Sequence, residues 1–270
     1  MDFDQLKLIK NENERISALY TMFNEDSRLS KSKAARVEFI TTMRYIEKYL
    51  KKDSKIIDIG AGAGEYSLHL AKMGYSVSAV ELADTNVAAF RNKLTPDLNV
   101  DLHQGDACDL SSFTDNSFDI VLLLGPLYHI LDQENREKCI AEARRVCSVS
   151  GVIFFAYISN DMVILTETFK YDGDYLKMGN YNKQTFAVNN FPFVFTTASA
   201  AREELVANGI LIKHEVAVDG VSELLADKIN KLDDEGYQNY LDYHFYCCEK
   251  PEMLGRSNHM LFVGCHNPTC

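Results

Sequence analysis

The sequence predicts an α/β fold, in which a seven-stranded, mostly parallel sheet carries helices on both faces. The first observation is a regular alternation, between residues 55 and 157, of short apolar segments with longer amphipathic ones. Such alternation is typical of βαβ units and therefore of parallel strands. The second is a glycine-rich turn directly after the first apolar segment, where open parallel sheets bind ligands. The third is that the alternation resumes from residue 199 and adds two more strands.

The first 50 residues precede this alternation, and we expect them to form a helical extension that caps the rest. Two helices are predicted here, because apolar residues recur at helical spacing on one face of each. These residues are Ile16, Leu19, Tyr20 and Phe23 in the first helix, and Phe39, Met43, Ile46 and Leu50 in the second.

Residues 51–159 are expected to form the core of the domain. Short apolar runs predict its strands at residues 55–59, 76–81, 100–104, 118–124 and 151–157. The amphipathic segments between them predict helices at residues 65–73, 84–93 and 133–147. Gly74 closes the first of these helices and Pro96 follows the second, as is typical of helix ends.

The segment at residues 160–196 interrupts the alternation. It has no strong helical period, and eight Phe or Tyr lie between residues 160 and 195, which can supply large apolar contacts. A substrate lid, a small satellite core and a dimer contact are all open interpretations. Residues 197–270 are expected to complete the core, with strands at 210–218 and 260–266 and helices at 199–208, 221–232 and 237–248.

Composition and charge disfavour several classes of protein. Lys and Arg number 28 against 39 Asp and Glu, and the net charge of −11 argues against nucleic acid as a partner, because phosphate contacts need a basic face. No apolar run approaches the roughly 20 residues of a membrane span, and the acidic start lacks the pattern of a secretory signal. Seven cysteines without a CxxC pair favour reduced thiols. The expected location is therefore cytoplasmic.

The strongest local signal is the turn after the first predicted strand, in which Gly60, Gly62 and Gly64 alternate with alanines. Glycines are needed where a backbone turns sharply or where a ligand must approach the main chain. A dinucleotide-binding turn would place its third glycine at position 65, which is Glu65. This spacing disfavours a nicotinamide-dependent oxidoreductase. No Gly-Lys-Ser/Thr follows the turn, so it does not match a nucleotide-binding P-loop either.

The pattern Asp58-x-Gly60-x-Gly62-x-Gly64 resembles motif I of the class I S-adenosylmethionine-dependent methyltransferases. The resemblance covers about residues 50–160. It implies a Rossmann-like class I methyltransferase fold, whose last strand lies antiparallel beside the fifth. It also implies that S-adenosyl-L-methionine is the cofactor and that it binds near Asp58 and the three glycines.

Three further features fall in the order and spacing of that family. Glu81 ends a strand at the position where the family's carboxylate binds both ribose hydroxyls. Asp106 resembles the residue that accepts a hydrogen bond from the adenine amino group, and the backbone N–H of Ala107 would meet the adenine ring. Leu124 ends the strand that lies beside the methionine part of the cofactor.

The segment Gly125-Pro126-Leu127-Tyr128-His129 follows that strand, where the family places substrate-side residues. It lacks the Asn or Asp that precedes Pro-Pro-Tyr in many methylases of base or amide nitrogens, and it resembles the bacterial small-molecule branch. His129 is a candidate general base, since its unperturbed pKa of about 6.5 suits proton removal at neutral pH. The alternative is a structural histidine at a helix start. Tyr128 is either a wall of the active site or a packing residue.

Two other groups of residues are candidates. The helical extension contains Tyr20, Arg28, Glu38, Thr42 and Arg44. The resemblance implies that a Tyr or Arg there meets the methionine carboxylate, and a surface position is the alternative for each. The end of the chain is rich in metal-ligand types, but their spacing does not fit a zinc site, so no metal is expected. These residues are His244, Cys247, Cys248, His259, Cys265, His266 and Cys270.

The sequence thus favours in-line methyl transfer from S-adenosyl-L-methionine to a small-molecule acceptor. Two alternatives remain open: a cofactor-binding protein of regulatory or scaffold function without catalysis and, with less support, a NAD-dependent oxidoreductase. A small-molecule substrate is the expected partner, and a homodimer is an option for the aromatic segment. Neither nucleic acid nor a membrane is expected.

Overall fold

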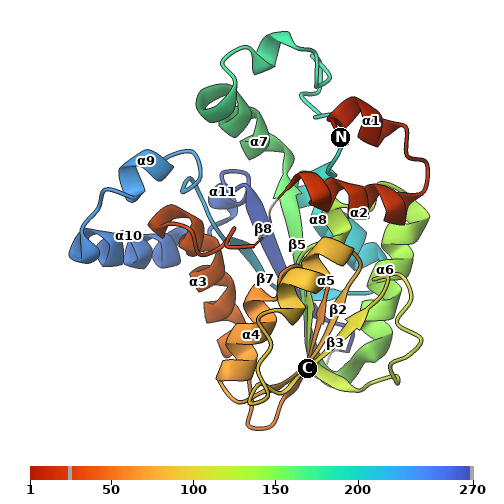
Figure 1. Ribbon diagram of the computed structural model, residues 1–270. Helices are drawn as coiled ribbons and strands as arrows, with labels where there is room; N and C mark the ends of the chain where they lie inside the picture. The colour runs from red at the N-terminus through yellow and green to blue at the C-terminus, as the bar shows by residue number, and fades with distance from the viewer. Residues whose placement is uncertain (24–25, 268–270) are drawn as a thin grey trace.

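The protein is described by a computed structural model that covers residues 1–23 and 26–267. One sheet forms its centre, and helices cover both faces of the sheet (Figure 1). The main path of the sheet follows the order β3-β2-β1-β4-β5-β8-β7. The bounds of these strands are β1 Lys55–Ile59, β2 Ser76–Glu81, β3 Val100–Gln104, β4 Phe118–Leu123, β5 Cys147–Ser159, β7 Leu211–Ala217 and β8 His259–Cys265.

The sheet is mostly parallel, as predicted. The five strands from β3 to β5 run parallel to their neighbours, whereas β8 is antiparallel to both β5 and β7. The expected antiparallel last strand beside the fifth is therefore confirmed. The count differs by one, because a two-residue strand, β6 (Phe195–Thr196), pairs in parallel with the end of β5. A strand this short leaves no period in the sequence from which to predict it.

The core has two layers, one on each face of the sheet. Neighbouring residues of β1 point to opposite faces, so Ile56 packs in a cluster with residues of α3 and α4, and Ile57 in a cluster with residues of α6 and α8. Both isoleucines are fully buried. Strands covered on both faces read as continuous apolar runs, which is why these segments were recognisable in the sequence.

The helices that flank the sheet occupy the predicted positions within one or two residues at most ends. They are α3 (Lys33–Glu47), α4 (Glu65–Lys72), α5 (Asp84–Arg91), α6 (Gln133–Val146), α8 (Ala198–Ala207) and α10 (Asp234–Cys247). The first predicted helix of the extension is α2 (Glu12–Met22), and a short helix that was not predicted, α1 (Phe3–Lys7), precedes it.

One prediction of local structure was wrong, and the segment at 160–196 contains a helix that its sequence pattern did not indicate. Residues 221–232 contain only the four-residue helix α9 (Ala226–Ile229), because the backbone N–H groups of Asp219 and Gly220 both donate to Ser257 and the chain turns at Gly220. The segment at 160–196 does contain a helix, α7 (Asn160–Thr166), which continues as a π-helical turn, Glu167–Tyr171. Its continuous apolar run, residues 162–165, hid the helical period.

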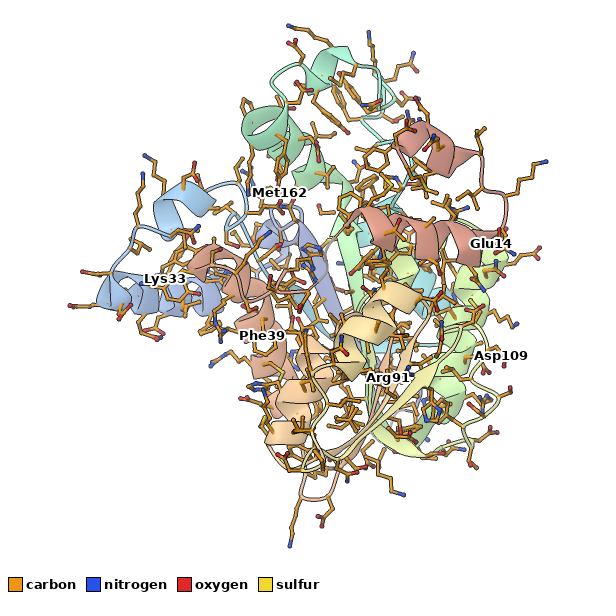
Figure 2. All side chains as sticks on the ribbon, in the orientation of Figure 1. Glu14, Lys33, Phe39, Arg91, Asp109 and Met162 are labelled. Atoms are coloured by element: carbon orange, nitrogen blue, oxygen red, sulfur yellow. The ribbon has the colours of Figure 1, made fainter. Side chains whose placement is uncertain are left out.

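The carboxyl ends of the parallel strands meet at one edge of the sheet. β5 leads from this edge into α7, and α1 and α2 lie at the same end of the molecule (Figure 1). α10 packs beside α3, whose first residue is Lys33 (Figure 2). Lys33 donates to the carboxylate of Asp234 and to the carbonyl of Leu232. A further helix of one turn, α11 (Pro251–Leu254), precedes β8. The helical extension and the 160–196 segment therefore both cover the edge where open sheets bind ligands.

Neither stretch of the described chain, residues 1–23 or 26–267, holds a helix long and apolar enough to cross a bilayer. Five cysteines are free thiols, and all five are buried: Cys108, Cys139, Cys147, Cys247 and Cys248. Cys265 is disulfide-bonded, so the expectation of reduced thiols is wrong at this residue. Whether two sulfurs meet depends on the folded geometry, and the spacing of cysteines in the sequence does not reveal it. Cys270 lies outside the described residues.

Candidate active site

The glycine-rich turn after β1 has a backbone that only glycine adopts without strain. Gly60, Gly62 and Gly64 all have positive φ, at 73°, 57° and 86°. A Cβ on Gly60 would lie 2.7 Å from the ring of Pro126, and one on Gly64 would lie 2.5 Å from the ring of Phe90. The turn is therefore packed against its neighbours so closely that a side chain at either end would displace them.

Asp58 lies behind this turn. Its carboxylate is buried and accepts a hydrogen bond of 2.6 Å from the hydroxyl of Ser67 on α4. The pKa of Asp58 is raised to about 6, chiefly by burial and also by the nearby carboxylate of Glu81, while the hydrogen bond from Ser67 opposes both effects. Asp58 therefore ties the glycine turn to the first turn of the following helix.

Glu81, at the end of β2, fixes the same turn from the other side. One of its carboxylate oxygens accepts from the backbone N–H of Gly62 at 2.8 Å, and the other accepts from the N–H of Ala83 at 2.9 Å and from the amide of Asn86 at 3.2 Å. The side chain is buried, with 5% of its surface exposed. A buried carboxylate at a strand end is thus held in one orientation beside the glycine turn.

A cavity of about 320 Å³ opens beside Glu81. The residues that line it come from the ends of several strands and from α2, and they include Asn13, Tyr20, Gly60, Glu81, Gly105, Asp106, Ala107, Gly125 and His129. A second hollow of about 50 Å³ shares Tyr20, Gly60 and Gly125 with the first. It is further lined by Arg28, Asp58, Gly62, Tyr66, Leu124 and Tyr128. The two hollows adjoin at these three shared residues, and we refer to them as the larger and the smaller end of one cleft.

The residues predicted from the sequence therefore divide between the two ends of this cleft. Glu81, Asp106, Ala107 and His129 line the larger end, whereas Asp58, Gly62, Leu124 and Tyr128 line the smaller one, and Gly60 lines both. Gly64 lines neither and instead packs against Phe90.

The N-terminal part of α2 covers the larger end and contributes residues that sequence reasoning missed. The amide of Asn13 donates to the carboxylate of Asp106 at 2.8 Å. The carboxylate of Glu12 accepts from the backbone N–H of Leu131 at 2.7 Å and from the amide of Asn135 at 3.0 Å. These contacts join α2 to the segments after β3 and β4. No signal in the sequence relates Asn13 to a residue 93 positions away.

His129 forms a pair with Tyr20 from α2. The Tyr20 hydroxyl and Nε2 of His129 are 2.7 Å apart. Burial and, to a smaller extent, the positive charge of Arg28 together lower the pKa of His129 to about 3. The imidazole is therefore neutral near pH 7, and the expectation of a pKa suited to proton removal at neutral pH is wrong, because desolvation disfavours the charged form.

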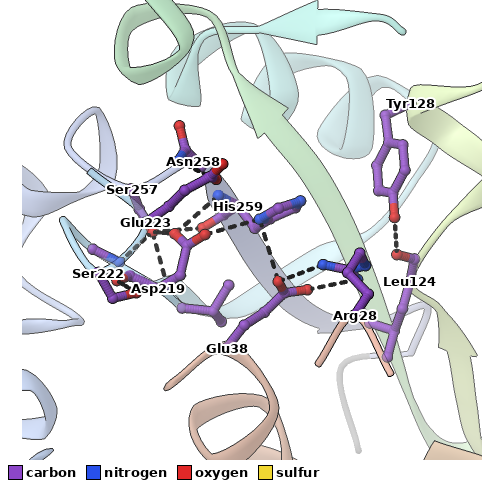
Figure 3. Close-up of polar contacts among 12 residues, drawn as sticks. Arg28, Glu38, Leu124, Tyr128, Asp219, Ser222, Glu223, Ser257, Asn258 and His259 are labelled. Carbon is purple, nitrogen blue, oxygen red and sulfur yellow. Dashed lines mark hydrogen bonds and ion pairs between the residues drawn. The ribbon is translucent and has the colours of Figure 1, made fainter. Parts of the chain in front are cut away.

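An aromatic wall surrounds this pair. The ring of His129 lies 4.9 Å from the ring of Tyr128 and 5.2 Å from that of Phe193, measured between centroids. The backbone N–H of Val194 donates to the carbonyl of Tyr128, which fixes the end of the 160–196 segment against the site. The Tyr128 hydroxyl in turn donates to the carbonyl of Leu124 at 3.0 Å (Figure 3). The wall therefore lies directly beside the glycine turn.

The remaining candidates lie in different places. Arg28 lines the smaller end of the cleft and forms a two-pronged ion pair with Glu38. Thr42 is buried, and Arg44 stacks over the ring of Phe245 on α10, outside both lining sets. His244 is also buried and lies 3.1 Å from the carbonyl of Val218.

Among the described residues, one group of three possesses metal-ligand atoms within 4.8 Å of one another, and it consists of Glu38, Asp219 and His259. Only His259 belongs to the set of metal-ligand types at the end of the chain.

Comparison with known proteins shows what the chain is similar to. Residues 57–155 match the model of a methyltransferase domain. A ubiquinone biosynthesis O-methyltransferase of Hydrogenovibrio crunogenus is 27% identical over 154 residues, which are 57% of this chain and 61% of that protein. The matched part thus spans less than two thirds of this curated relative.

Two solved structures share the fold. A SAM-dependent methyltransferase of Thermotoga maritima aligns with a TM-score of 0.59 at 16% identity and covers 93% of this chain and 100% of that one. A second, from Methanosarcina mazei, aligns with a TM-score of 0.53 at 19% identity and covers 82% of this chain and 95% of that one. At such identities the likeness shows the Rossmann-like fold alone.

Proposed function

Residues 57–155 match a methyltransferase domain, and from this premise we propose that the chain uses S-adenosyl-L-methionine as its cofactor and transfers the cofactor's methyl group to a small aromatic acceptor. One observation carries the proposal. Gly60, where a side chain would meet Pro126, the fixed carboxylate of Glu81, and the rings of His129 and Tyr128 all line the cleft. That arrangement offers a binding site for an adenosyl group at one end and for a flat acceptor beside it.

The residues of the cleft fit the cofactor. Glu81 is buried, yet it lines the cavity, so its carboxylate is available to the two ribose hydroxyls. Asp106 lines the same cavity and already accepts an N–H donor from Asn13, which is the kind of contact an adenine amino group would make. We propose that Gly60 and Gly62 lie against the cofactor backbone to backbone, with Leu124 beside its methionine part.

The reaction requires little covalent chemistry from the protein. When bound, the cofactor supplies a methyl group on a positively charged sulfur, which is already electrophilic. The protein must hold the acceptor in line with that methyl group and exclude water from it. We assign this task to Tyr128 and the His129–Tyr20 pair, whose rings line the cleft, with Phe193 packed against His129 behind them. We assign His129 to shaping the site, because a neutral imidazole with so low a pKa is a poor proton acceptor.

The aromatic wall supports an aromatic acceptor, since rings pack edge-to-face or stacked with a gain beyond their buried area. The name of the curated relative, a ubiquinone biosynthesis O-methyltransferase, agrees with a small-molecule acceptor. The net charge of −11 supports the absence of a nucleic-acid partner. Association into a homodimer and a cytoplasmic location remain predictions, which light scattering and cell fractionation would test.

The test is methyl transfer from S-adenosyl-L-methionine carrying a labelled methyl group, with a panel of phenols, catechols and aromatic amines. We expect labelled product and S-adenosylhomocysteine in equal amounts with at least one aromatic acceptor. A Gly60→Ala variant is the negative control, because its new Cβ would meet Pro126 and disturb the glycine turn. Binding of S-adenosylhomocysteine without transfer to any acceptor of the panel would favour the regulatory alternative over catalysis.

A further inference from the structure

Four charged residues from distant parts of the chain meet in one line at the smaller end of the cleft (Figure 3). Arg28 donates from Nη1 to Oε2 of Glu38 at 2.7 Å and from Nη2 to Oε1 at 3.1 Å. Nδ1 of His259 lies 3.4 Å from Oε2 of Glu38 and 2.9 Å from Oδ2 of Asp219. Cation and anion therefore alternate along the line from Arg28 to Asp219.

The far end of this line is anchored to the backbone. Oδ1 of Asp219 accepts from the hydroxyl of Ser257 at 2.5 Å and from the backbone N–H of His259 at 3.1 Å. The Ser257 hydroxyl oxygen also accepts from the backbone N–H of Gly220 at 2.8 Å. Asp219 is buried, with 4% of its surface exposed. Its carboxylate is thus held in a fixed position and orientation.

The pKa shifts of the two inner residues, Glu38 and His259, agree with this alternation of cation and anion. Burial raises the pKa of Glu38, but Arg28 and His259 outweigh it and leave the pKa below its usual value. Burial lowers the pKa of His259, but Glu38 and Asp219 outweigh it and raise the pKa to about 9, with Arg28 opposing them. Tyr66, from α4, also faces Glu38. At neutral pH Glu38 is therefore an anion and His259 a cation.

Only Arg28 in this line borders the cleft. It lines the smaller end together with Gly62, Tyr66 and Leu124, beyond the glycine turn as seen from Glu81. If the ribose binds at Glu81, the amino-acid part of the cofactor extends into this end. Glu38 accepts from two of the five N–H donors of the guanidinium. An arginine held in this way has a fixed plane and orientation, and a guanidinium suits a carboxylate.

We propose that Asp219, His259 and Glu38 form a positioning chain that fixes Arg28 against the carboxylate of the cofactor's methionine part. The proposal rests on the proposed function and extends it to residues that touch no part of the cofactor. Arginine loses much rotamer freedom when it is fixed. A chain that fixes it before binding removes that loss from the binding step. The same chain joins α3, the end of β7 and the start of β8, three segments that the cofactor does not contact.

The experiment compares two ligands by titration calorimetry: S-adenosylhomocysteine, and 5′-methylthioadenosine, which lacks the amino-acid part. In a His259→Gln variant we expect the Kd for S-adenosylhomocysteine to rise about tenfold, on the loss of one charge-assisted contact. The Kd for methylthioadenosine should change less than twofold. A His214→Gln variant is the matched control, because His214 pairs with Glu249 and Tyr49 outside both lining sets of the cleft.

Each outcome decides between explanations. An equal loss for both ligands would assign His259 a merely structural role and overturn the proposal, as would no loss for either. Asp219→Asn should reproduce the selective loss in a second variant that keeps a hydrogen-bonding side chain, should His259→Gln fail to fold. In an Arg28→Met variant, a further His259→Gln change should add nothing, since contacting residues that act as a unit are not additive.

Two further results distinguish a failure of this proposal from a failure of the proposed function and from a metal site. If the wild-type protein binds neither ligand, the proposed function fails, whatever the variants do. Zinc titrated into the wild-type protein without cofactor should give no saturable heat, because the lone pairs that a metal would need are engaged by Arg28 and by the His259 proton. Saturable zinc binding that His259→Gln abolishes would make these residues a metal site and overturn the positioning chain.

Discussion

The substitution Glu81→Gln tests the ribose contact with the least change in shape. The carboxylate of Glu81 holds the N–H groups of Gly62 and Ala83, and it lines the larger end of the cleft. A glutamine has the same length but only one oxygen acceptor, and it carries no charge. The variant therefore keeps the packing of β2 while it weakens whatever the carboxylate binds.

The magnitude follows from the strength of the contacts. Hydrogen bonds to a charged group contribute about 1.5–3 kcal/mol each, and those between neutral groups about 0.5–1.5 kcal/mol. For two ribose hydroxyls the neutral amide should lose roughly 2 kcal/mol in total. At 1.4 kcal/mol for each tenfold change, the Kd for S-adenosylhomocysteine should rise about thirtyfold. A full truncation, Glu81→Ala, should weaken binding by at least about tenfold as well. It would also leave the N–H groups of Gly62 and Ala83 without their acceptor.

Titration calorimetry with S-adenosylhomocysteine measures the effect directly. Asp101→Asn is the matched control, because it also removes one negative charge, from the exposed side chain of the neighbouring strand β3. Its Kd should stay within twofold of the wild-type value. Urea unfolding of both variants separates lost binding from lost stability. An unchanged Kd in a folded Glu81→Gln protein would refute the assignment of Glu81 to the ribose.

Three further predictions concern the turn and the two histidines. Gly60→Ala should abolish detectable binding of S-adenosylhomocysteine. It should also destabilise the fold by about 1–2 kcal/mol, because alanine is strained in the left-handed backbone conformation of Gly60. Gly173→Ala is the control, because a Cβ there meets nothing within 4 Å, and it should have neither effect. Because the pKa of His259 is raised from about 6.5 to about 9, its protonated form should stabilise the fold. This contribution should be fully present below pH 6.5 and lost as the pH rises through 9. The loss is on the order of 3 kcal/mol, and urea midpoints at pH 6.5 and 9.5 should show it in the wild type but not in His259→Gln. Because the pKa of His129 is lowered to about 3, the neutral imidazole should stabilise the fold above pH 6.5, and this contribution should be lost as the pH falls towards 3. In His129→Gln the unfolding free energy should therefore fall less steeply with pH over this range. An equally steep fall in the variant would contradict the burial argument.

The sequence was sufficient to predict features that depend on local pattern. The strands were recognisable because residues such as Ile56 and Ile57 are apolar on both faces of a covered sheet. The glycine turn was recognisable because its positive φ angles leave few other residue types at Gly60 and Gly64. The choice of Glu81 and Asp106 followed from the resemblance to the methyltransferase family, and the parallel strands place both residues at one edge of the sheet.

What the sequence did not reveal depends on contacts between distant segments. Asn13 meets Asp106 only because α2 folds back over the sheet. His259 reaches Glu38 because β8 is antiparallel, which places its first residue at the carboxyl edge of the parallel strands. The pKa of His129 was mispredicted because the reference value describes an exposed imidazole, whereas the folded chain buries it against aromatic rings.

The most direct test of the account is the crystal structure of the protein with S-adenosylhomocysteine. The account predicts the ribose hydroxyls within hydrogen-bonding distance of Glu81, the adenine amino group at Asp106 and the amino-acid carboxylate at Arg28. A ligand bound outside the cleft, or a cleft closed by side chains when the ligand is present at saturating concentration, would contradict it.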